Sequence, residues 1–294
     1  MISIIIPSFN NLKYLKLCIN SLEKNSYFKN ETLVHINEGS DGTIDYVKQK
    51  KIKFTYSPVN DGLCVGCNKV SKLSVHNYIL YAHDDMYFLP NWDLFLIEEA
   101  KSLNTNKFYL SSIMINGDPK LNGHLNLHAG DTVENFDEDY LLQNYNDLKH
   151  NDFQGSTWAP HLIHKDIWNE VGGFSEEFSP GMGSDPDLNM KLWKSGVRIF
   201  KCLSKSRVYH FGSVTIHKNQ KFNLKRNQGS NAHKIFLLKW GITIKFFKKY
   251  YLKADTLHNE NLVEPNKKIS YYIDLTKDKF SYYYYKLISL FKLR

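Results

Sequence analysis

Short apolar runs alternate with segments of helical periodicity along the first third of the chain. Residues 2–6 form one such run, and leucine and isoleucine then recur every three or four positions from Leu12 to Leu22. That spacing is typical of one buried face of a helix. Further strand-like runs cover residues 33–37, 53–57 and 78–82. This alternation predicts an α/β fold with a mostly parallel central sheet, flanked by helices and joined by right-handed crossovers.

The pattern in the rest of the chain is less regular. It predicts helices over residues 91–103, 165–171 and 184–194 and strands over 108–112, 197–202 and 208–210. Residues 113–150 are polar and interrupted by glycine and proline, so we expect an irregular loop there, of the length that often covers a binding site. We expect one domain over residues 1–225, with halves 1–112 and 113–225, and a basic, aromatic-rich helical extension over 226–294.

Two adjacent carboxylates follow the apolar run that begins at Tyr78. Asp84 and Asp85 lie at the predicted carboxyl edge of the sheet, where open α/β sheets bind their ligands. Their charges repel each other unless solvent or a cation separates them. A divalent ion that holds a diphosphate would explain the pair, but so would a solvated turn in which one carboxylate caps the helix after Pro90. On this segment alone both interpretations stay open.

Composition narrows the range of partners. The 294 residues carry a net charge of +8, which favours anionic partners such as nucleotide phosphates or membrane headgroups. The charge is not interleaved with a nucleic-acid recognition motif, so we expect no nucleic acid partner. No apolar run reaches transmembrane length and the N-terminus does not resemble a signal peptide, so we expect a cytoplasmic protein. A single Cys64-x-x-Cys67 pair does not complete a zinc site, which favours buried thiols.

Several short motifs occur in the order and spacing of one known family. They are IIIPSFN (residues 4–10), NEGSDGT (37–43), NDG with a later asparagine (60–68), HDD (83–85), GGFSE (172–176), SDPDL (184–188) and VYH (208–210). Together they resemble the motifs of inverting family 2 glycosyltransferases, over roughly residues 1–245. The resemblance implies a GT-A fold, the Rossmann-like fold of nucleotide-diphospho-sugar transferases. Residues 1–112 would then bind the nucleotide-sugar and residues 113–225 the acceptor.

The resemblance also implies an activity. A sugar would move from a nucleotide donor, with a UDP-sugar as the first expectation, to a hydroxyl of a glycan or lipid-linked acceptor, with inversion. Mn²⁺ or Mg²⁺ would be held by Asp85 and His210 and would neutralise the departing diphosphate. Asp185 would be the general base, Trp158 would stack on the acceptor, and Lys239 would contact a phosphate. The residues expected around the nucleotide are Pro7, Phe9, Asn10, Asn37, Glu38, Asp61, Gly62, Asn68 and Asp84.

These residues also have structural interpretations. Asp185 would then cap a helix, and Trp158 would fill the core. Gly62 and Asn68 would pack a helix against the sheet, and His210 would bond a backbone carbonyl. The sequence does not decide between the two sets of roles.

Two departures from the family pattern keep other functions open. His83 stands where an aspartate is usual, and Ser184 replaces an acid beside Asp185. A non-catalytic member that binds a glycan or a nucleotide is therefore one alternative. A nucleotidyltransferase is another, although the sequence lacks a glycine-rich phosphate loop after the first strand. The basic, aromatic tail is compatible with a contact at the inner face of a membrane, and also with a helix packed on the domain or in a homodimer.

Overall fold

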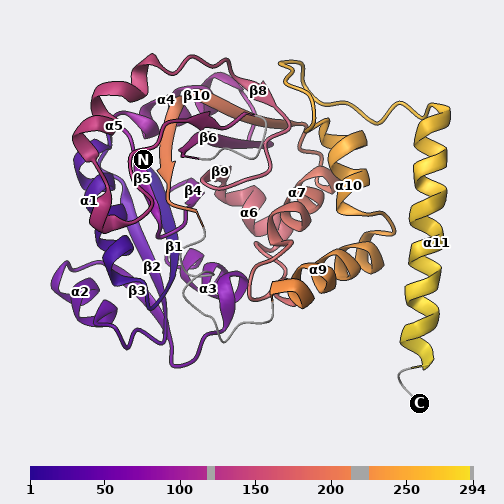
Figure 1. Ribbon diagram of the computed structural model, residues 1–294, viewed down its shortest axis with the longest axis horizontal. Coiled ribbons are helices and arrows are strands. Elements are labelled where there is room, and N and C mark those ends of the chain that lie inside the picture. The colour runs from indigo at the N-terminus through magenta and orange to yellow at the C-terminus, as the bar shows by residue number, and fades with distance from the viewer. Residues whose placement is uncertain (118–122, 213–224, 292–294) are drawn as a thin grey trace.

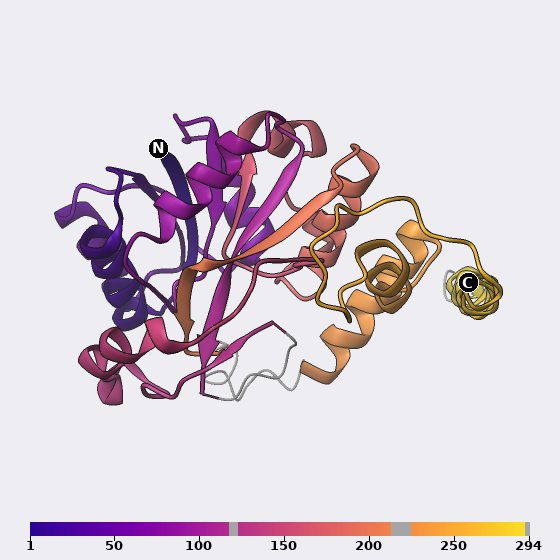
Figure 2. The same ribbon diagram turned by 90° about the horizontal axis from the view of Figure 1, so that it is seen from above.

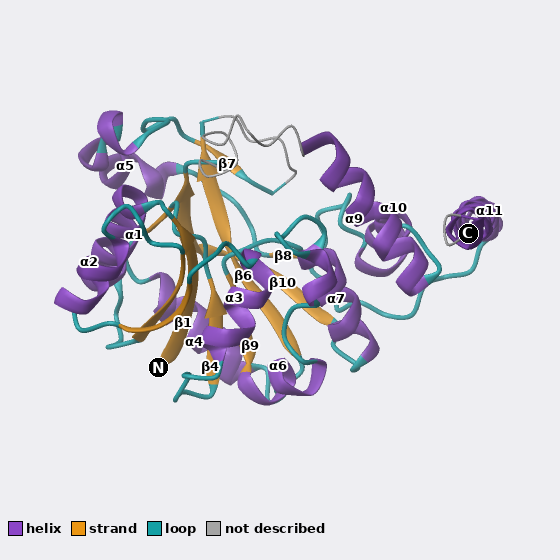
Figure 3. Ribbon diagram, turned by 90° about the horizontal axis from the view of Figure 1, so that it is seen from below, coloured by secondary structure: helices purple, strands orange, loops and turns teal. Residues whose placement is uncertain are grey.

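A ten-stranded mixed sheet forms the centre of the protein (Figure 1). The computed structural model describes residues 1–117, 123–212 and 225–291. Helices cover both faces of the sheet. Figure 3 shows α1 (Leu12–Asn25) and α2 (Thr43–Gln49) on one side of the strands and α6 (Lys165–Val171) and α7 (Ser184–Lys194) on the other.

The strands follow the order β3-β2-β1-β4-β9-β6-β10-β5, while β7 pairs with β6 and β8 with β10. Their bounds are β1 (Ile2–Phe9), β2 (Glu31–Asn37), β3 (Lys53–Ser57), β4 (Tyr78–Tyr81), β5 (Met86–Phe88), β6 (Phe108–Asn116), β7 (Leu125–Asn126), β8 (Phe153–Gln154), β9 (His161–His164) and β10 (Ile199–His210). The remaining helices are α3 (Gly62–Ser71), α4 (Trp92–Ser102), α5 (Glu138–Asn144), α9 (Lys225–Trp240), α10 (Ile244–Phe246) and α11 (Ile269–Phe291). The shorter turns are η1 (Val133–Asn135), η2 (Tyr145–Asp147), η3 (Glu176–Phe178) and η4 (Phe247–Leu252), of which η4 is π-helical.

The first four strands form as the sequence predicts. β1 lies between β2 and β4, and all three run parallel, with Ile4 opposite Thr32 on one side and Leu80 on the other. Strand neighbours on both edges and helices on both faces bury the isoleucines of β1 completely. This environment explains why β1 is a continuous apolar run rather than an alternating one.

Side-chain hydrogen bonds fix the helices on each face. Right-handed crossovers place α1 and α3 on opposite faces of the sheet. Asp93 of α4 accepts hydrogen bonds from the N–H groups of Tyr27 and Phe28, just after α1. On the other face, Nε1 of Trp168 in α6 donates to Oγ of Ser71 at the end of α3, at 3.2 Å. These bonds hold the helices whose first turns border the carboxyl edge.

The later strands differ from the prediction in direction and extent. β9 runs antiparallel between β4 and β6, and β5 runs antiparallel to β10. A short apolar run looks the same in either direction, so the sequence does not reveal this. Residues 113–150, predicted as an irregular loop, contain the end of β6 together with β7, η1, α5 and η2. The strands predicted over 197–202 and 208–210 are one strand, β10, with an irregular register between Leu203 and Arg207.

The C-terminal helices form a further layer beside α7, and α11 stands at its outer edge (Figures 1 and 2). Nε1 of Trp240 at the end of α9 donates to Oδ1 of Asp187 in α7 at 2.8 Å, which anchors this layer. The predicted domain boundary at residue 225 adjoins residues 213–224, which lie outside the described part. Within the described ranges, no helix combines the length and the apolar character needed to cross a membrane.

Candidate functional site

Polar loops that are distant in sequence meet at the carboxyl edge of the sheet. The loops after β1, β2, β3 and β4 share this edge because the four strands are parallel. β10 is parallel to β6, and β9 is antiparallel to both β6 and β4. The end of β10 therefore reaches the same edge and brings His210 to these loops.

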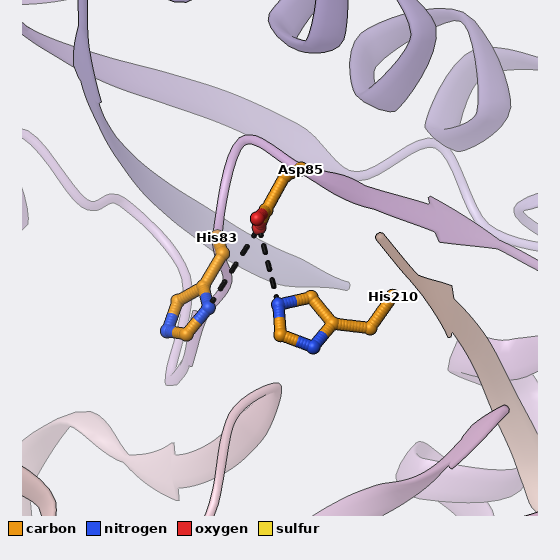
Figure 4. A group of neighbouring side chains, drawn as sticks. All are labelled: His83, Asp85 and His210. Carbon is orange, nitrogen blue, oxygen red and sulfur yellow. Dashed lines mark ion pairs between the residues drawn. The ribbon is translucent and has the colours of Figure 1, made fainter. Parts of the chain in front are cut away.

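His83, Asp85 and His210 point toward one another (Figure 4). His210 Nε2 lies 3.2 Å and His83 Nδ1 lies 3.9 Å from the same oxygen, Asp85 Oδ1. One ligand atom of each residue lies within 4.8 Å of those of the other two. The Asp85 side chain is nearly buried, whereas those of His83 and His210 are 31% and 13% exposed, so the imidazoles border solvent.

The backbone explains how His210 reaches this cluster. β5 and β10 pair in antiparallel fashion, with Met86 opposite His210. The N–H of Phe211 donates to the carbonyl oxygen of Asp85 at 3.2 Å. The pairing of β5 with β10 thus sets the distance between the Asp85 carboxylate and the His210 ring.

Burial and charge act differently on the two imidazoles. Burial lowers the pKa of His83 to about 4, and the nearby Asp85 carboxylate only partly opposes this. Burial also acts to lower the pKa of His210, but the charge and the hydrogen bond of Asp85 outweigh it and raise the pKa above its usual value. His83 is therefore neutral at pH 7, whereas Asp85 favours the protonated form of His210, and a cation beside Asp85 would compete with that proton.

The donor set of this cluster fits a divalent cation. A carboxylate oxygen suits Mg²⁺ or Mn²⁺, whereas imidazole nitrogens suit transition metals better than Mg²⁺. Two imidazoles and one carboxylate therefore favour Mn²⁺ over Mg²⁺. His83 stands where the family pattern has an aspartate, so it gives the cluster an imidazole nitrogen in place of a carboxylate oxygen.

Asp84 has a different environment from Asp85. Ser8 Oγ donates to its Oδ2 at 2.6 Å, and Asn11 Nδ2 donates to its Oδ1 at 3.0 Å. Burial, reinforced by the charge of Asp85, raises the pKa of Asp84 to about 7. Neither carboxylate caps a helix, because α4 begins after Asn91 in a left-handed conformation. The interpretation of the pair as a solvated turn with a helix cap is therefore wrong.

Four of the nine residues predicted around the nucleotide form one hydrogen-bond network at the ends of β1, β2 and β3, in which Ser57 joins two pairs. Asn10 Nδ2 donates to Glu38 Oε2 at 3.1 Å, and Asn37 Oδ1 accepts the N–H of Asp61 at 3.0 Å. Asp61 is held by Lys69, whose Nζ lies 2.6 Å from its Oδ2. Two further predicted residues, both half-buried in β1, are Pro7 and Phe9. The network leaves Asn10 and Glu38 at the solvent border.

Gly62 and Asn68 take part in packing. Gly62 has a φ of +85°, and a Cβ there would lie 2.7 Å from the Cα of Pro180. The amide of Asn68 brackets the backbone of Phe174, with Nδ2 donating to its oxygen at 2.8 Å and Oδ1 accepting its N–H at 2.9 Å. Glu176 is a further partner of the Asn68 amide at 3.3 Å. The packing interpretation accounts for Asn68 without a phosphate.

Asp185 lies in the first turn of α7 and does not cap it. The N-cap is Gly183, and no side chain makes a cap hydrogen bond there. Asp185 Oδ1 is buried and has no hydrogen-bond partner among the described residues. Burial raises the pKa of Asp185 to about 7, although the charge of Lys248 opposes this. A buried carboxylate oxygen with no partner is an open acceptor for a substrate proton.

Tyr81 connects the cluster of Asp85 with Asp185. Its ring lies 5.3 Å from that of His83 and 5.1 Å from that of Phe174, measured between centroids. Burial raises its pKa well above the usual range, and the charges of both Asp185 and Asp85 add to the effect. Both carboxylates therefore lie within electrostatic range of the same buried phenol.

Trp158 and Lys239 have protein partners. Trp158 Nε1 donates to the oxygen of Ser112 at 3.2 Å, and its half-buried ring packs on His124. Lys239 Nζ lies 2.7 Å from Glu177 Oε1 and 3.0 Å from an oxygen of Asp187. The phosphate contact predicted for Lys239 is therefore replaced by ion pairs with these two carboxylates.

Sequence reasoning missed four residues of this region. Ser8 and Asn11, which hold Asp84, lie inside or beside the opening motif, so their position there was an available signal. Tyr81 lies within an apolar strand and Lys248 in a π-helical turn of the tail, and neither belongs to a motif.

Comparisons with known proteins agree with this geometry. The family model described as glycosyl transferase family 2 matches residues 3–168, more than half of the chain. Comparison with curated protein sequences gave no match. The structure of TarS from S. aureus in complex with UDP superposes with a TM-score of 0.51 and 18% identity, over 71% of this chain and 59% of that chain. This chain thus spans less than two thirds of that structure.

The complex of TarS with UDP-GlcNAc gives a TM-score of 0.51 and 17% identity, over 80% of both chains. At such identities the likeness shows the fold, which is the GT-A fold predicted from the motifs. The match over residues 3–168 shows the family. The chain is therefore a member of glycosyl transferase family 2.

Proposed function

We propose that the chain transfers a sugar from a nucleoside diphosphate donor to a hydroxyl of a glycan or lipid-linked acceptor, with inversion at the anomeric carbon. The observation that carries this proposal is the position of two carboxylates from different halves of the chain. Asp85 and Asp185 both lie close enough to the buried phenol of Tyr81 for their charges to raise its pKa, which supports a shared site. Inversion needs groups of this kind on opposite sides of the reacting carbon.

Asp85, His210 and His83 are the residues that would hold a divalent cation, with Mn²⁺ as the ion that suits their donor atoms. A bound cation would supply positive charge against the departing diphosphate. Ser8 and Asn11 position Asp84, which lies next to Asp85 in the same turn. Asp84 thereby keeps the turn in the conformation that presents Asp85.

Asp185 is the group that would take the proton of the acceptor hydroxyl. Its Oδ1 needs a donor, and a pKa near 7 suits a general base at neutral pH. The exposed part of Trp158 is a surface on which the acceptor sugar would stack. The proton would pass directly from the acceptor oxygen to Asp185 Oδ1.

The network of Asn10, Asn37, Glu38 and Asp61 is the proposed site of the nucleoside. Its amides and carboxylates offer both donors and acceptors to a base and a ribose. TarS, which shares the fold, has been crystallised with UDP and with UDP-GlcNAc. On this basis we propose a UDP-sugar as the donor. A thermal-shift comparison of UDP, GDP, CDP and dTDP with Mn²⁺ tests the base, since a bound ligand raises the apparent stability.

Two conservative variants test the site. Asp185→Asn is expected to lower sugar transfer from UDP-GlcNAc by about 10²- to 10⁴-fold, because the base is lost, with unchanged affinity for UDP. Asp85→Asn is expected to weaken UDP binding in Mn²⁺, measured by calorimetry. Asp166→Asn is the matched control, because that carboxylate on α6 is 76% exposed.

Full turnover in both variants would remove this assignment of the site. A wild-type protein that binds UDP and turns over no sugar donor would favour the non-catalytic alternative instead. Loss of UDP affinity in Asp185→Asn would place that residue at the donor and not at the acceptor.

A further inference from the structure

Helix α11 has two faces of different character. On its inner face Tyr271 is 6% and Asp278 8% exposed, and the Tyr271 ring packs on Phe246 at 5.0 Å. Asp278 Oδ2 accepts the N–H of Thr243 at 2.6 Å, and Asp274 pairs with Lys249 at 2.8 Å. These contacts fix the rotation of α11 about its own axis, and so they fix which side chains point outward.

The outer face of α11 is a stripe of large apolar side chains, each more than half exposed. They are Ile269 (79%), Tyr272 (53%), Ile273 (52%), Phe280 (74%), Tyr283 (64%), Tyr284 (61%) and Leu287 (55%). Residues at this spacing lie on one side of a helix. We call this set the outer stripe. α11 lies at the edge of the molecule in both views, with the body on one side only (Figures 1 and 2).

A continuous apolar stripe of this length differs from isolated exposed residues and marks an interaction surface. None of the described residues outside α11 covers it. The stripe therefore requires a partner that offers apolar contacts along the whole helix.

The exposed charges at the borders of the outer stripe are mainly positive. Lys277, Lys279 and Lys286 are exposed there, although Lys277 pairs with Asp274 at 3.2 Å. Asp274 also pairs with Lys249, and Asp278 turns inward to Thr243. A hollow of about 260 Å³ between α10 and α11 is lined by three lysines, Lys245, Lys249 and Lys277, and by these two carboxylates. A partner that fits the outer stripe would therefore offer an apolar region to the exposed side chains and negative charges to the lysines beside them.

We propose that the outer stripe of α11 lies in the interface of a lipid bilayer that carries anionic headgroups. An amphipathic helix with lysines at the border of its apolar face binds such a surface through buried apolar area and attraction to anionic lipid. A second copy fits less well, because two stripes packed on each other would bring lysines of both helices together. This surface is separate from the site at the carboxyl edge and is independent of the proposed activity.

Flotation of the full chain with vesicles tests this proposal. We expect binding to vesicles of phosphatidylcholine and phosphatidylglycerol, and weaker binding to phosphatidylcholine alone. Added salt should reduce the difference, because it screens the lysines. Phe280→Glu/Leu287→Glu is expected to lower the partition onto mixed vesicles by at least about tenfold, since both side chains would leave the acyl region. Val75→Glu is the control, because Val75 is 62% exposed and lies outside α11.

Circular dichroism and the melting temperature of the Phe280→Glu/Leu287→Glu variant should match those of the wild type, because both side chains are exposed in the folded chain. Absence of vesicle binding by the wild type would overturn the proposal. Equal binding by Phe280→Glu/Leu287→Glu would do the same. A wild-type dimer in sedimentation velocity that this variant makes monomeric, with no vesicle binding, would assign the stripe to a second copy instead.

Discussion

The unpartnered oxygen of Asp185 is the most informative single atom of the site. Leaving a buried polar atom without a hydrogen bond costs about 1–3 kcal/mol, and a hydroxyl donor that reached Asp185 Oδ1 would recover that energy. Asp84 is also buried, yet both of its oxygens accept hydrogen bonds from Ser8 and Asn11. This contrast supports the proposal that Asp185, and not Asp84, receives the proton of the acceptor hydroxyl.

The raised pKa of Asp185 predicts a pH dependence. Below its pKa of about 7 the carboxyl group keeps its proton and cannot accept another. The kcat/KM of transfer should therefore fall about tenfold for each pH unit below that value and level off above it. The measurement is a pH profile of kcat/KM in saturating Mn²⁺. A profile that stays flat from pH 5 to 8 would exclude Asp185 as the base.

The sequence predicted only part of this residue-level arrangement. Asp85 and His210 came from motifs, and their proximity depends on the pairing of β5 with β10. The bonds of Ser8 and Asn11 to Asp84 depend on how β1 and β4 align, which periodicity does not encode. The ion pairs of Lys239 with Glu177 and Asp187 depend on how α9 docks on α7, a contact between segments far apart in sequence.

At the scale of elements, the first half of the fold was predictable and the second half only in part. β1, β2 and β4 are largely buried on both faces, so their apolar runs are unambiguous, whereas β3 is a partly exposed edge strand. β9 was not predicted as a strand, because its four residues carry little signal of type and none of direction. The turn from β3 into α3 is set by Gly62, whose φ of +85° and contact with Pro180 join α3 to the segment before α7.

Substitution of Gly62 tests this junction. Gly62→Ala should lower the free energy of unfolding by about 3 kcal/mol, because a left-handed residue gains a Cβ and that Cβ meets the Pro180 backbone. Gly172→Ala is the matched control, since Gly172 also has a positive φ but nothing lies within 4 Å of a Cβ there. Its cost should be about 1 kcal/mol. If urea titrations gave the same loss of unfolding free energy for both variants, the close approach of the added Cβ to Pro180 would have no energetic cost.

At the scale of the whole molecule, histidines within the sheet link stability to pH. His35 in β2 is fully buried, with Nδ1 2.7 Å from Thr55 Oγ1. Burial lowers its pKa to about 4, and burial also lowers that of His161 in β9 to about 3. A histidine whose folded pKa lies below its unfolded value stabilises the fold above the unfolded value, about 6.5. That contribution is lost as the pH falls toward the folded pKa.

The difference between wild type and His35→Gln isolates this effect, because glutamine does not titrate. Between pH 7 and pH 4 the wild type should lose up to about 3 kcal/mol more stability than the variant. The wild type alone would not show this effect, because Asp84 and Asp185 change stability with pH in the opposite direction. Their raised pKa values favour proton uptake in the folded state, so they stabilise the fold as the pH falls. Urea titrations at the two pH values give the measurement. Equal losses of unfolding free energy in both proteins would show that folding does not lower the pKa of His35.

The position of β10 in the chain has a consequence for biosynthesis. It is the last of the described strands to leave the ribosome, and it carries His210 to its place beside Asp85. A nascent polypeptide that has completed β1 to β9 already displays the acidic turn but lacks one imidazole of the cluster. The three residues His83, Asp85 and His210 therefore come together only after translation has passed residue 210 and β10 has joined the sheet. Truncated translation products that end before this point would lack the His210 imidazole of the proposed metal site.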